Sequence, residues 1–118
     1  MAPSHLSIAT GALQRLVKEE ASYHKEMEQQ KVRIAKLEGE KGTEVSGSDG
    51  NEAFELRQEK QALEETKRVI PGLREKITSA REKLESLLGD DAANEQEKEK
   101  AMDVLKQAKE AQKDDPVG

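Results

Sequence analysis

The chain has 118 residues, of which 38% are charged and 33% hydrophobic, with a net charge of −5, two aromatic side chains and no cysteine. This length allows one domain at most, and the lack of cysteine excludes disulfide, thiolate and cysteine-zinc chemistry. An acidic chain with so few aromatics and no long apolar run is a poor match for nucleic acid or for a membrane span, and its start, MAPSHLS, lacks the features of a signal peptide. We therefore expect a soluble, cytosolic domain.

Apolar residues recur along the chain with the period of a coiled coil. Such a lean composition is otherwise typical of disorder, but a repeat of 3.5 residues keeps one narrow apolar seam facing a partner helix. In the first half the seam is interrupted only at Glu20 and Gln30. We therefore predict an all-α fold, an elongated antiparallel three-helix bundle that forms one domain over residues 1–118. The seam consists of Leu6, Ala9, Leu13, Leu16, Tyr23, Met27, Ile34 and Leu37, followed by Leu56, Leu63, Ile70, Ile77 and Leu84.

Three helices and their breaks follow in order. We expect helices over about residues 7–40, 51–88 and 92–112, and a frayed tail over 113–118. The segment 39–51 is rich in glycine and serine, as loops are. Asp49 with Glu52 is a candidate capping box for the second helix. Gly89 followed by Asp90 and Asp91 predicts the end of that helix and the N-cap of the third.

Pro71-Gly72 permits two interpretations. One is a hairpin turn that would give a four-helix bundle, and the other is a proline kink inside one long helix. The seam keeps its seven-residue step from Leu56 to Leu84 straight through Pro71. Because a reversal of chain direction would normally reset that phase, we favour a second helix kinked at Pro71.

The helix lengths predict an end of the bundle that is only two helices thick. The first two helices would each span roughly 50 Å at about 1.5 Å per residue, and the third is shorter. Folded back through Gly89, the third helix can cover the second only to about residue 68. We expect Ile34, Leu37, Leu56 and Leu63 to be half-buried there, and the polar residues Gln30, Glu59 and Thr66 to leave the seam wet. This apolar strip is a first candidate binding surface.

A basic column borders the seam of the second helix. With Leu56 at heptad position a, position e is occupied by Lys60, Lys67, Arg74 and Arg81. These charges could pair within the molecule, with Glu19 or with an acidic third helix, or they could receive an acidic protein partner. The third helix can cover Arg74 and Arg81 but cannot reach Lys60.

No catalytic constellation stands out in the sequence. His5 and His24 are the only histidines, and neither has a second ligand at metal-binding spacing. Phosphate-binding glycine motifs and the acidic ladder of a calcium loop are also missing. We expect a protein that is not an enzyme and uses no cofactor and no metal.

Particular residues resemble a known family. Thr10-Gly11, Arg15-Leu16-Val17-Lys18-Glu19, Tyr23, Lys25-Glu26 and Gln29-Gln30 resemble the first helix of tubulin-binding cofactor A. Glu65, Arg68, Ile70-Pro71, Arg81, Leu84 and Leu88 resemble its second helix, including a mid-helix proline, and Ala101, Val104 and Leu105 fit the third loosely. Gly72 stands where that family often has aspartate, and the loop is longer than usual.

The resemblance implies a function. Members of this family are three-helix bundles that capture β-tubulin folding intermediates reversibly, on helical faces and without nucleotide, on the way to the αβ-tubulin heterodimer. It also implies other tubulin-folding cofactors as partners and a cytoplasmic, cytoskeleton-associated location. The resemblance and the basic column together give the candidate partner-binding residues: Arg15, Lys18, Glu19, Tyr23, Lys25, Glu26, Gln29, Gln30, Lys60, Lys67, Arg68, Ile70 and Pro71.

Two other functions remain open at this point. The chain could be a structural coiled-coil module that dimerises as a tether and has no chaperone activity. It could also resemble a prefoldin subunit, but those carry strand-forming segments between their helices, and residues 39–51 contain only Val45 as a β-former. The half-covered strip predicts a monomer or a weak homodimer.

Overall fold

The protein folds into three α-helices over the part of the chain that the structure describes. This computed structural model describes residues 4–43, 51–89 and 94–113. The helices are α1 (His5–Thr43), α2 (Asn51–Leu87) and α3 (Glu95–Lys113). They pack against one another through apolar faces, which confirms the predicted all-α bundle.

The N-terminal caps of α1 and α3 are linked through the carboxylate of Glu97. Ser4 caps α1, because its hydroxyl oxygen accepts the Ser7 backbone N–H at 3.0 Å. Asn94 and Glu97 form a capping box at α3: the Asn94 side chain accepts the Glu97 N–H at 2.8 Å, and Glu97 accepts the Asn94 N–H at 3.1 Å. The Ser4 hydroxyl also donates to the other oxygen of Glu97. The starts of α1 and α3 are therefore tied together.

The start of α3 differs from our expectation. The helix begins at Glu95, whereas we expected it near residue 92 with Asp90 or Asp91 as the cap. Asn94 takes that role because only it has a glutamate at the third position of the helix, which a reciprocal capping box requires. The capping box predicted for Asp49 and Glu52 lies outside the described residues.

Helix α2 continues through Pro71. The helix runs for 37 residues with Pro71 inside it, so the hairpin-turn interpretation, with its four helices, is wrong. The unbroken seven-residue step of the seam predicted this continuity correctly. A bend of α2 at Pro71 stays a prediction.

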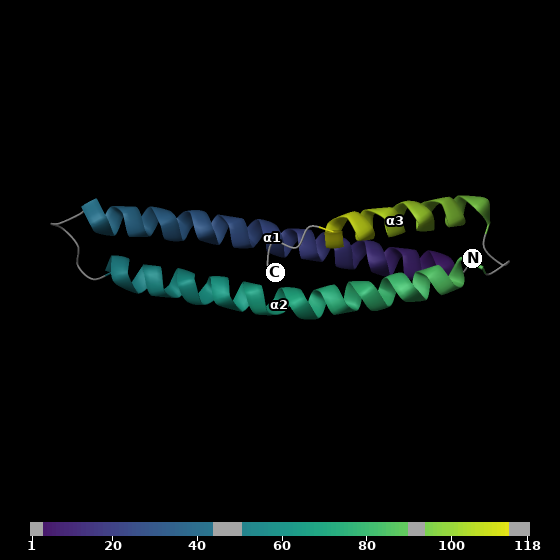
Figure 1. The fold of residues 1–118 in the computed structure, drawn as a ribbon, viewed down its shortest axis with the longest axis horizontal. Coiled ribbons are helices and arrows are strands. Elements are labelled where there is room, and N and C mark those ends of the chain that lie inside the picture. Colours follow the sequence, from purple (N-terminus) through teal and green to yellow (C-terminus); the bar gives the residue numbers. More distant parts are fainter. Residues whose placement is uncertain (1–3, 44–50, 90–93, 114–118) are drawn as a thin grey trace. The chain divides into compact units, whose positions relative to one another are not determined.

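The bundle divides into two compact parts at Pro71. The three-helix part comprises residues 1–21 and 71–118, and the two-helix part comprises residues 22–70. In the three-helix part, α3 lies beside the first turns of α1 and the C-terminal half of α2 (Figure 1). In the two-helix part only α1 and α2 pack together, as the helix lengths predicted.

The three-helix part contains the main core. Leu13, Ile77 and Leu84 are fully buried, and α3 contributes Ala101, Val104, Leu105 and Ala108. Thr10 is also buried, and its hydroxyl donates to the Leu6 carbonyl oxygen at 2.7 Å. A polar group can be buried there because the preceding helical turn supplies its acceptor.

The seam of the two-helix part is more deeply buried than we expected. Met27 and Ile70 are buried, and Ile34 and Leu56 are only 9% and 7% exposed. Our expectation of half-burial was therefore wrong for Ile34 and Leu56, although Leu37 and Leu63 are half-buried. Two helices can cover the residues at the centre of their seam and leave only the flanking ones open to water.

Two of the three polar residues of this seam are also buried. Gln30 and Thr66 are 3% and 6% exposed, which corrects the expectation of a hydrated seam, while Glu59 is half-buried. Thr66 is satisfied by the Ala62 carbonyl oxygen at 3.0 Å. The side-chain oxygen of Gln30 has no hydrogen-bond partner among the described residues. Burial of Gln30 therefore lowers the stability of the fold, because a buried polar atom without a hydrogen-bond partner loses its contact with water and gains no bond in return.

Candidate partner-binding surfaces

The predicted partner-binding residues divide between the two parts of the bundle. Arg15, Lys18, Glu19 and Pro71 belong to the three-helix part and are exposed. Lys25, Glu26, Gln29, Lys60 and Arg68 belong to the two-helix part and are also exposed, while Tyr23 and Lys67 are half-buried there. Gln30 and Ile70 are buried, so their side chains pack between the helices and are not available to a partner in this conformation.

The basic column beside the seam pairs within the molecule. Lys60 lies 3.4 Å from Glu38 of α1, and Lys67 lies 3.8 Å from Glu64 one turn earlier in α2. The first pair is about half exposed on both sides, so it contributes only about 0–1 kcal/mol and leaves both charges accessible. Lys60 and Lys67 therefore remain accessible to a partner, but neither is an isolated positive charge.

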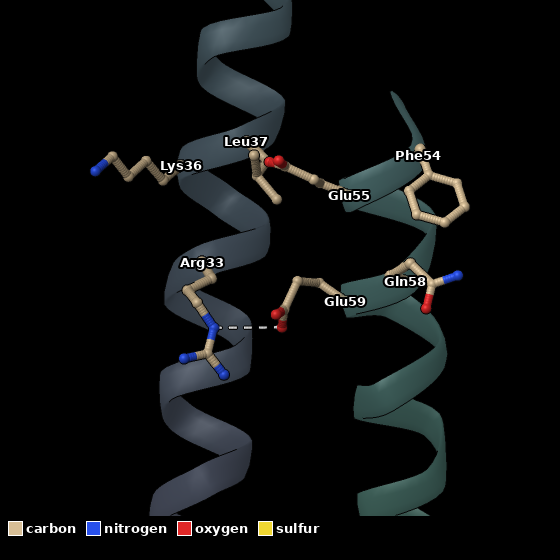
Figure 2. A pocket seen from close by; sticks show the side chains of 7 residues that line it. All are labelled: Arg33, Lys36, Leu37, Phe54, Glu55, Gln58 and Glu59. Atoms are coloured by element: carbon tan, nitrogen blue, oxygen red, sulfur yellow. Dashed lines mark ion pairs between the residues drawn. The ribbon is translucent and has the colours of Figure 1, made fainter. Parts of the chain in front are cut away.

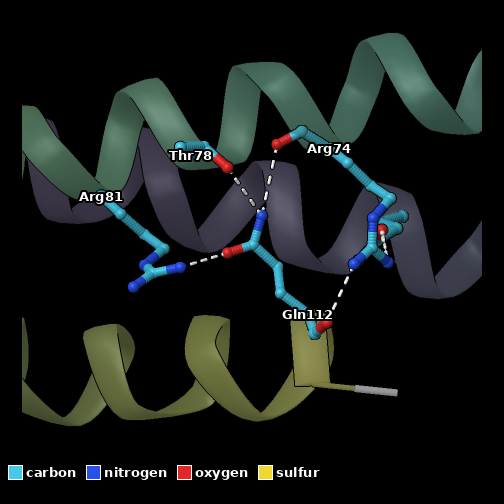
Figure 3. Close-up of polar contacts among 5 residues, drawn as sticks. Arg74, Thr78, Arg81 and Gln112 are labelled. Carbon is cyan, nitrogen blue, oxygen red and sulfur yellow. Dashed lines mark hydrogen bonds and ion pairs between the residues drawn. The ribbon is translucent and has the colours of Figure 1, made fainter. Parts of the chain in front are cut away.

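The other half of the column forms a network with α3 (Figure 3). Arg74 forms an ion pair with Glu20 at 3.3 Å, and its second terminal nitrogen donates to the Gln112 carbonyl oxygen at 2.9 Å. The Gln112 side chain points into α2, where its Nε2 donates to the Arg74 carbonyl oxygen and to Thr78 Oγ1, at 3.3 and 3.0 Å. Arg81 donates to Gln112 Oε1. The last turn of α3 is therefore held to α2 by hydrogen bonds.

This network corrects two details of the sequence analysis. Arg74 pairs with Glu20, which is 1% exposed, and not with the neighbouring Glu19. The third helix is also not acidic, because Glu95–Lys113 contains five acidic and five basic residues. It contacts Arg74 and Arg81 through the backbone carbonyl and the side-chain amide of Gln112. Gln112 was not identified as a contact residue in the sequence analysis. Gln112 does continue the buried spacing of Ala101, Leu105 and Ala108, and that spacing is the signal that could have identified it.

An open groove lies at the loop end of the two-helix part. Arg33, Lys36 and Leu37 line it from α1, and Phe54, Glu55, Gln58 and Glu59 line it from α2. In Figure 2, Arg33 and Glu59 reach toward each other across the groove, and their charged atoms are 3.3 Å apart. Phe54 is 54% exposed, and Val32, on the adjoining surface of α1, is 66% exposed.

This groove replaces the apolar strip that we expected. Of the four predicted strip residues only Leu37 lines it, because Ile34 and Leu56 are buried in the helix contact. Its exposed apolar side chain is Phe54, which lies off the seam, and the exposed Val32 lies on the adjoining surface of α1. A surface with exposed apolar side chains and charged margins is typical of a protein-binding site.

The described residues contain no group of three or more histidine, aspartate or glutamate side chains placed to hold a metal ion. Within the same residues, no helix has both the length and the apolar character that crossing a membrane would require.

Comparison with known proteins gives a consistent relationship. The family model "Tubulin binding cofactor A" matches residues 1–112. A Saccharomyces cerevisiae protein named tubulin-specific chaperone A is 38% identical over 88 residues, which cover 75% of this chain and 76% of that protein. Proteins of the same name from Homo sapiens and Bos taurus are 29% and 30% identical over 106 residues, covering 90% of this chain and 82% of each relative. No solved structure matches at a significant level. Because the family model spans nearly the whole chain, this protein belongs to the tubulin-binding cofactor A family.

Proposed function

We propose that this protein is a tubulin-folding cofactor that captures β-tubulin folding intermediates by reversible binding to its helical faces. The observation that carries the proposal is the family match over residues 1–112, which covers α1, α2 and all but the last residue of α3. The relatives named tubulin-specific chaperone A cover three quarters or more of the chain and support the same role. In this role it would act in the cytoplasm beside the cytoskeleton, together with other tubulin-folding cofactors and without an enzymatic step.

The structure supports binding through helical faces in two ways. Exposed charged residues of α1, including Lys18 and Lys25, point away from the helix contacts, so they contribute little to packing and are free to meet a partner. The groove beside Phe54 adds exposed apolar surface in the two-helix part. An interface that combines an apolar centre with a charged rim can bind and release a folding intermediate without chemistry.

Capture from cell extract tests the proposal. The immobilised protein should retain β-tubulin without α-tubulin, and charge reversal at Lys18, Lys25, Lys60 and Lys67 should weaken this capture. Retention should also fall as salt rises, because exposed charges are screened beyond about 10 Å at 0.1 M ionic strength. Reversal of Lys76 and Lys83, two exposed lysines of α2 in the three-helix part, is compared with reversal of Lys60 and Lys67 alone, which changes the net charge by the same amount. Circular dichroism checks that each variant is folded.

The alternative function, a coiled-coil tether, predicts a different result. A tether would retain no tubulin and would form a tight dimer at nanomolar concentration, which sedimentation equilibrium measures. We expect a monomer or a weak homodimer, because Ile34 and Leu56 of the seam are already buried within one chain. A tight dimer with no tubulin capture would overturn the proposed function.

A further inference from the structure

The outer face of α3 carries a row of lysines around one exposed methionine. Lys98, Met102, Lys106, Lys109 and Lys113 follow one another at steps of four, four, three and four residues. Residues at this spacing lie on the same face of an α-helix. Of the five lysines in α3, only Lys100 lies on another face. We call this set the lysine-methionine face.

The charges of this face are not neutralised by other described residues. None of its four lysines forms an ion pair within the described ranges, in contrast to Lys60, Lys67 and Arg74. Glu97, in the first turn of α3, is engaged by Ser4 and Asn94 at the cap. Glu95 lies on the same face, three residues before Lys98, and Glu99 and Glu110 border it. The four lysines outnumber this one glutamate, so the face is a local basic surface on a helix without net charge.

A groove adjoins the row of lysines. Its apolar residues are Leu88, which directly follows α2, and Met102 and Leu105 of α3. Glu85, Lys106, Lys109 and Glu110 complete its lining. Met102 is 61% exposed. A flexible, polarisable methionine on a surface adapts to apolar side chains of different shape. The groove can therefore accept an apolar side chain while the neighbouring lysines contact acidic ones.

The face is held on a rigid helix. The adjoining side of α3 is buried through Ala101, Val104, Leu105 and Ala108. The capping box with Asn94 fixes the start of α3, and Gln112 bonds its last turn to α2. Side chains presented on a fixed helix lose less conformational freedom on binding than those on a loop.

We propose that the lysine-methionine face is a docking site for an acidic polypeptide segment that places one apolar side chain in the groove beside Met102. Charge complementarity identifies this class of partner. A membrane fits less well, because the apolar side of α3 is buried in the bundle and Met102 is the only large apolar side chain exposed on the described helix. The proposal stands apart from capture of β-tubulin, since neither the lysines nor the groove belongs to the surfaces invoked for that function.

Synthetic peptides test this docking site directly. The probe is a fluorescein-labelled glutamate-rich peptide with one central phenylalanine, and a second peptide carries serine in its place. We expect Lys106→Glu with Lys109→Glu to weaken binding of the phenylalanine peptide at least about tenfold, the loss expected when close charge pairs become repulsive. Met102→Ser should weaken it about threefold and leave binding of the serine peptide unchanged. Fluorescence anisotropy measures both effects, and circular dichroism confirms folding.

Matched controls separate this site from general attraction. Lys76→Glu with Lys100→Glu changes the charge of the protein equally but leaves the face intact, and it should preserve binding. An equal loss in this control, or no binding of either peptide, would overturn the proposal. Tighter binding of the protein to vesicles of equal parts phosphatidylserine and phosphatidylcholine would also overturn the proposal, if the variants of the lysine-methionine face abolish that binding. Should the charge reversal disturb folding, Lys106→Gln with Lys109→Gln provides the same test.

Discussion

The two parts of the bundle bury polar groups in different ways. In the three-helix part the buried Glu20 is paired with Arg74, and Gln112 of α3 holds that arginine from the other side. In the two-helix part the buried Gln30 has an oxygen without a described partner, and the ion pairs lie at the margins. The third helix therefore adds apolar cover and also a hydrogen-bond partner for Arg74, the cation of α2 that makes the buried charge of Glu20 tolerable.

This difference predicts unequal costs for core truncation. Ile77 is fully buried among three helices, so Ile77→Ala should lower the free energy of unfolding by about 4 kcal/mol, since little can collapse into the cavity. Leu56 lies at a two-helix contact near 7% exposure, so Leu56→Ala should cost about 2 kcal/mol. Urea unfolding measures both values. Equal losses would show that α3 adds no packing advantage.

The next largest effect should come from the Glu20–Arg74 pair. Arg74→Met removes the cation beside a carboxylate that is 1% exposed, and breaking such a pair costs about 3 kcal/mol. Lys60→Met, which removes an exposed pair, should cost less than about 1 kcal/mol. The double change Glu20→Leu with Arg74→Met should recover most of the loss, because it leaves no buried charge. Failure to recover would mean that the Gln112 contacts dominate.

Much of this fold could be predicted from spacing, while the pairing of polar residues could not. The seven-residue step from Leu56 to Leu84 predicted both the helix and its passage through Pro71. Glu20 and Gln30 were interpreted as breaks in the seam, yet both are buried. A single helix pattern cannot show which residue of a distant helix will meet them, because that depends on the register between helices.

The candidate surfaces were predictable to a smaller extent. The exposed lysines of α1 follow from their heptad positions, and their role in binding stays a prediction. The groove beside Phe54 was not predicted, because Phe54 lies outside the seam and its exposure depends on how closely α1 and α2 approach. The Asn94–Glu97 cap could have been identified, since only Asn94 among the nearby candidates has a glutamate three residues later.

Pro71 marks the boundary between the two parts and offers a smaller test. Proline inside a helix removes one backbone hydrogen bond, and the adjacent Gly72 has open space where a Cβ would lie. Pro71→Ala should keep or raise stability, and Gly72→Ala should raise it by about 0.5–1 kcal/mol through helix propensity. Thermal melting checks both. Loss of a cooperative transition in Pro71→Ala would mean that the continuous helix depends on its proline.

The smallest expected effect concerns the cap shared by α1 and α3. Hydrogen bonds from the Ser4 hydroxyl and the Asn94 backbone amide hold the pKa of the Glu97 carboxyl below its ordinary value. The folded state thus binds a proton less readily than the unfolded chain, so the contribution of Glu97 to stability is complete above the ordinary carboxyl pKa. It is lost as the pH falls through the lowered value. Because Glu97 is only half-buried, solvent screens its charge and the effect is small, but it has a defined pH window.

Comparison of two glutamine variants isolates this effect. Glu97→Gln should lower the melting temperature at about pH 7, and this effect should shrink as the pH falls through the lowered pKa of the native carboxyl. Glu99→Gln removes an exposed carboxylate of the same helix that takes no part in the cap, so it controls for the change in net charge. The informative quantity is the difference between the two variants as a function of pH. A difference that persists unchanged at low pH would mean that Glu97 supports the cap through its shape alone. A difference that disappears together with the protonation of Glu97 would show that its charge joins the starts of α1 and α3.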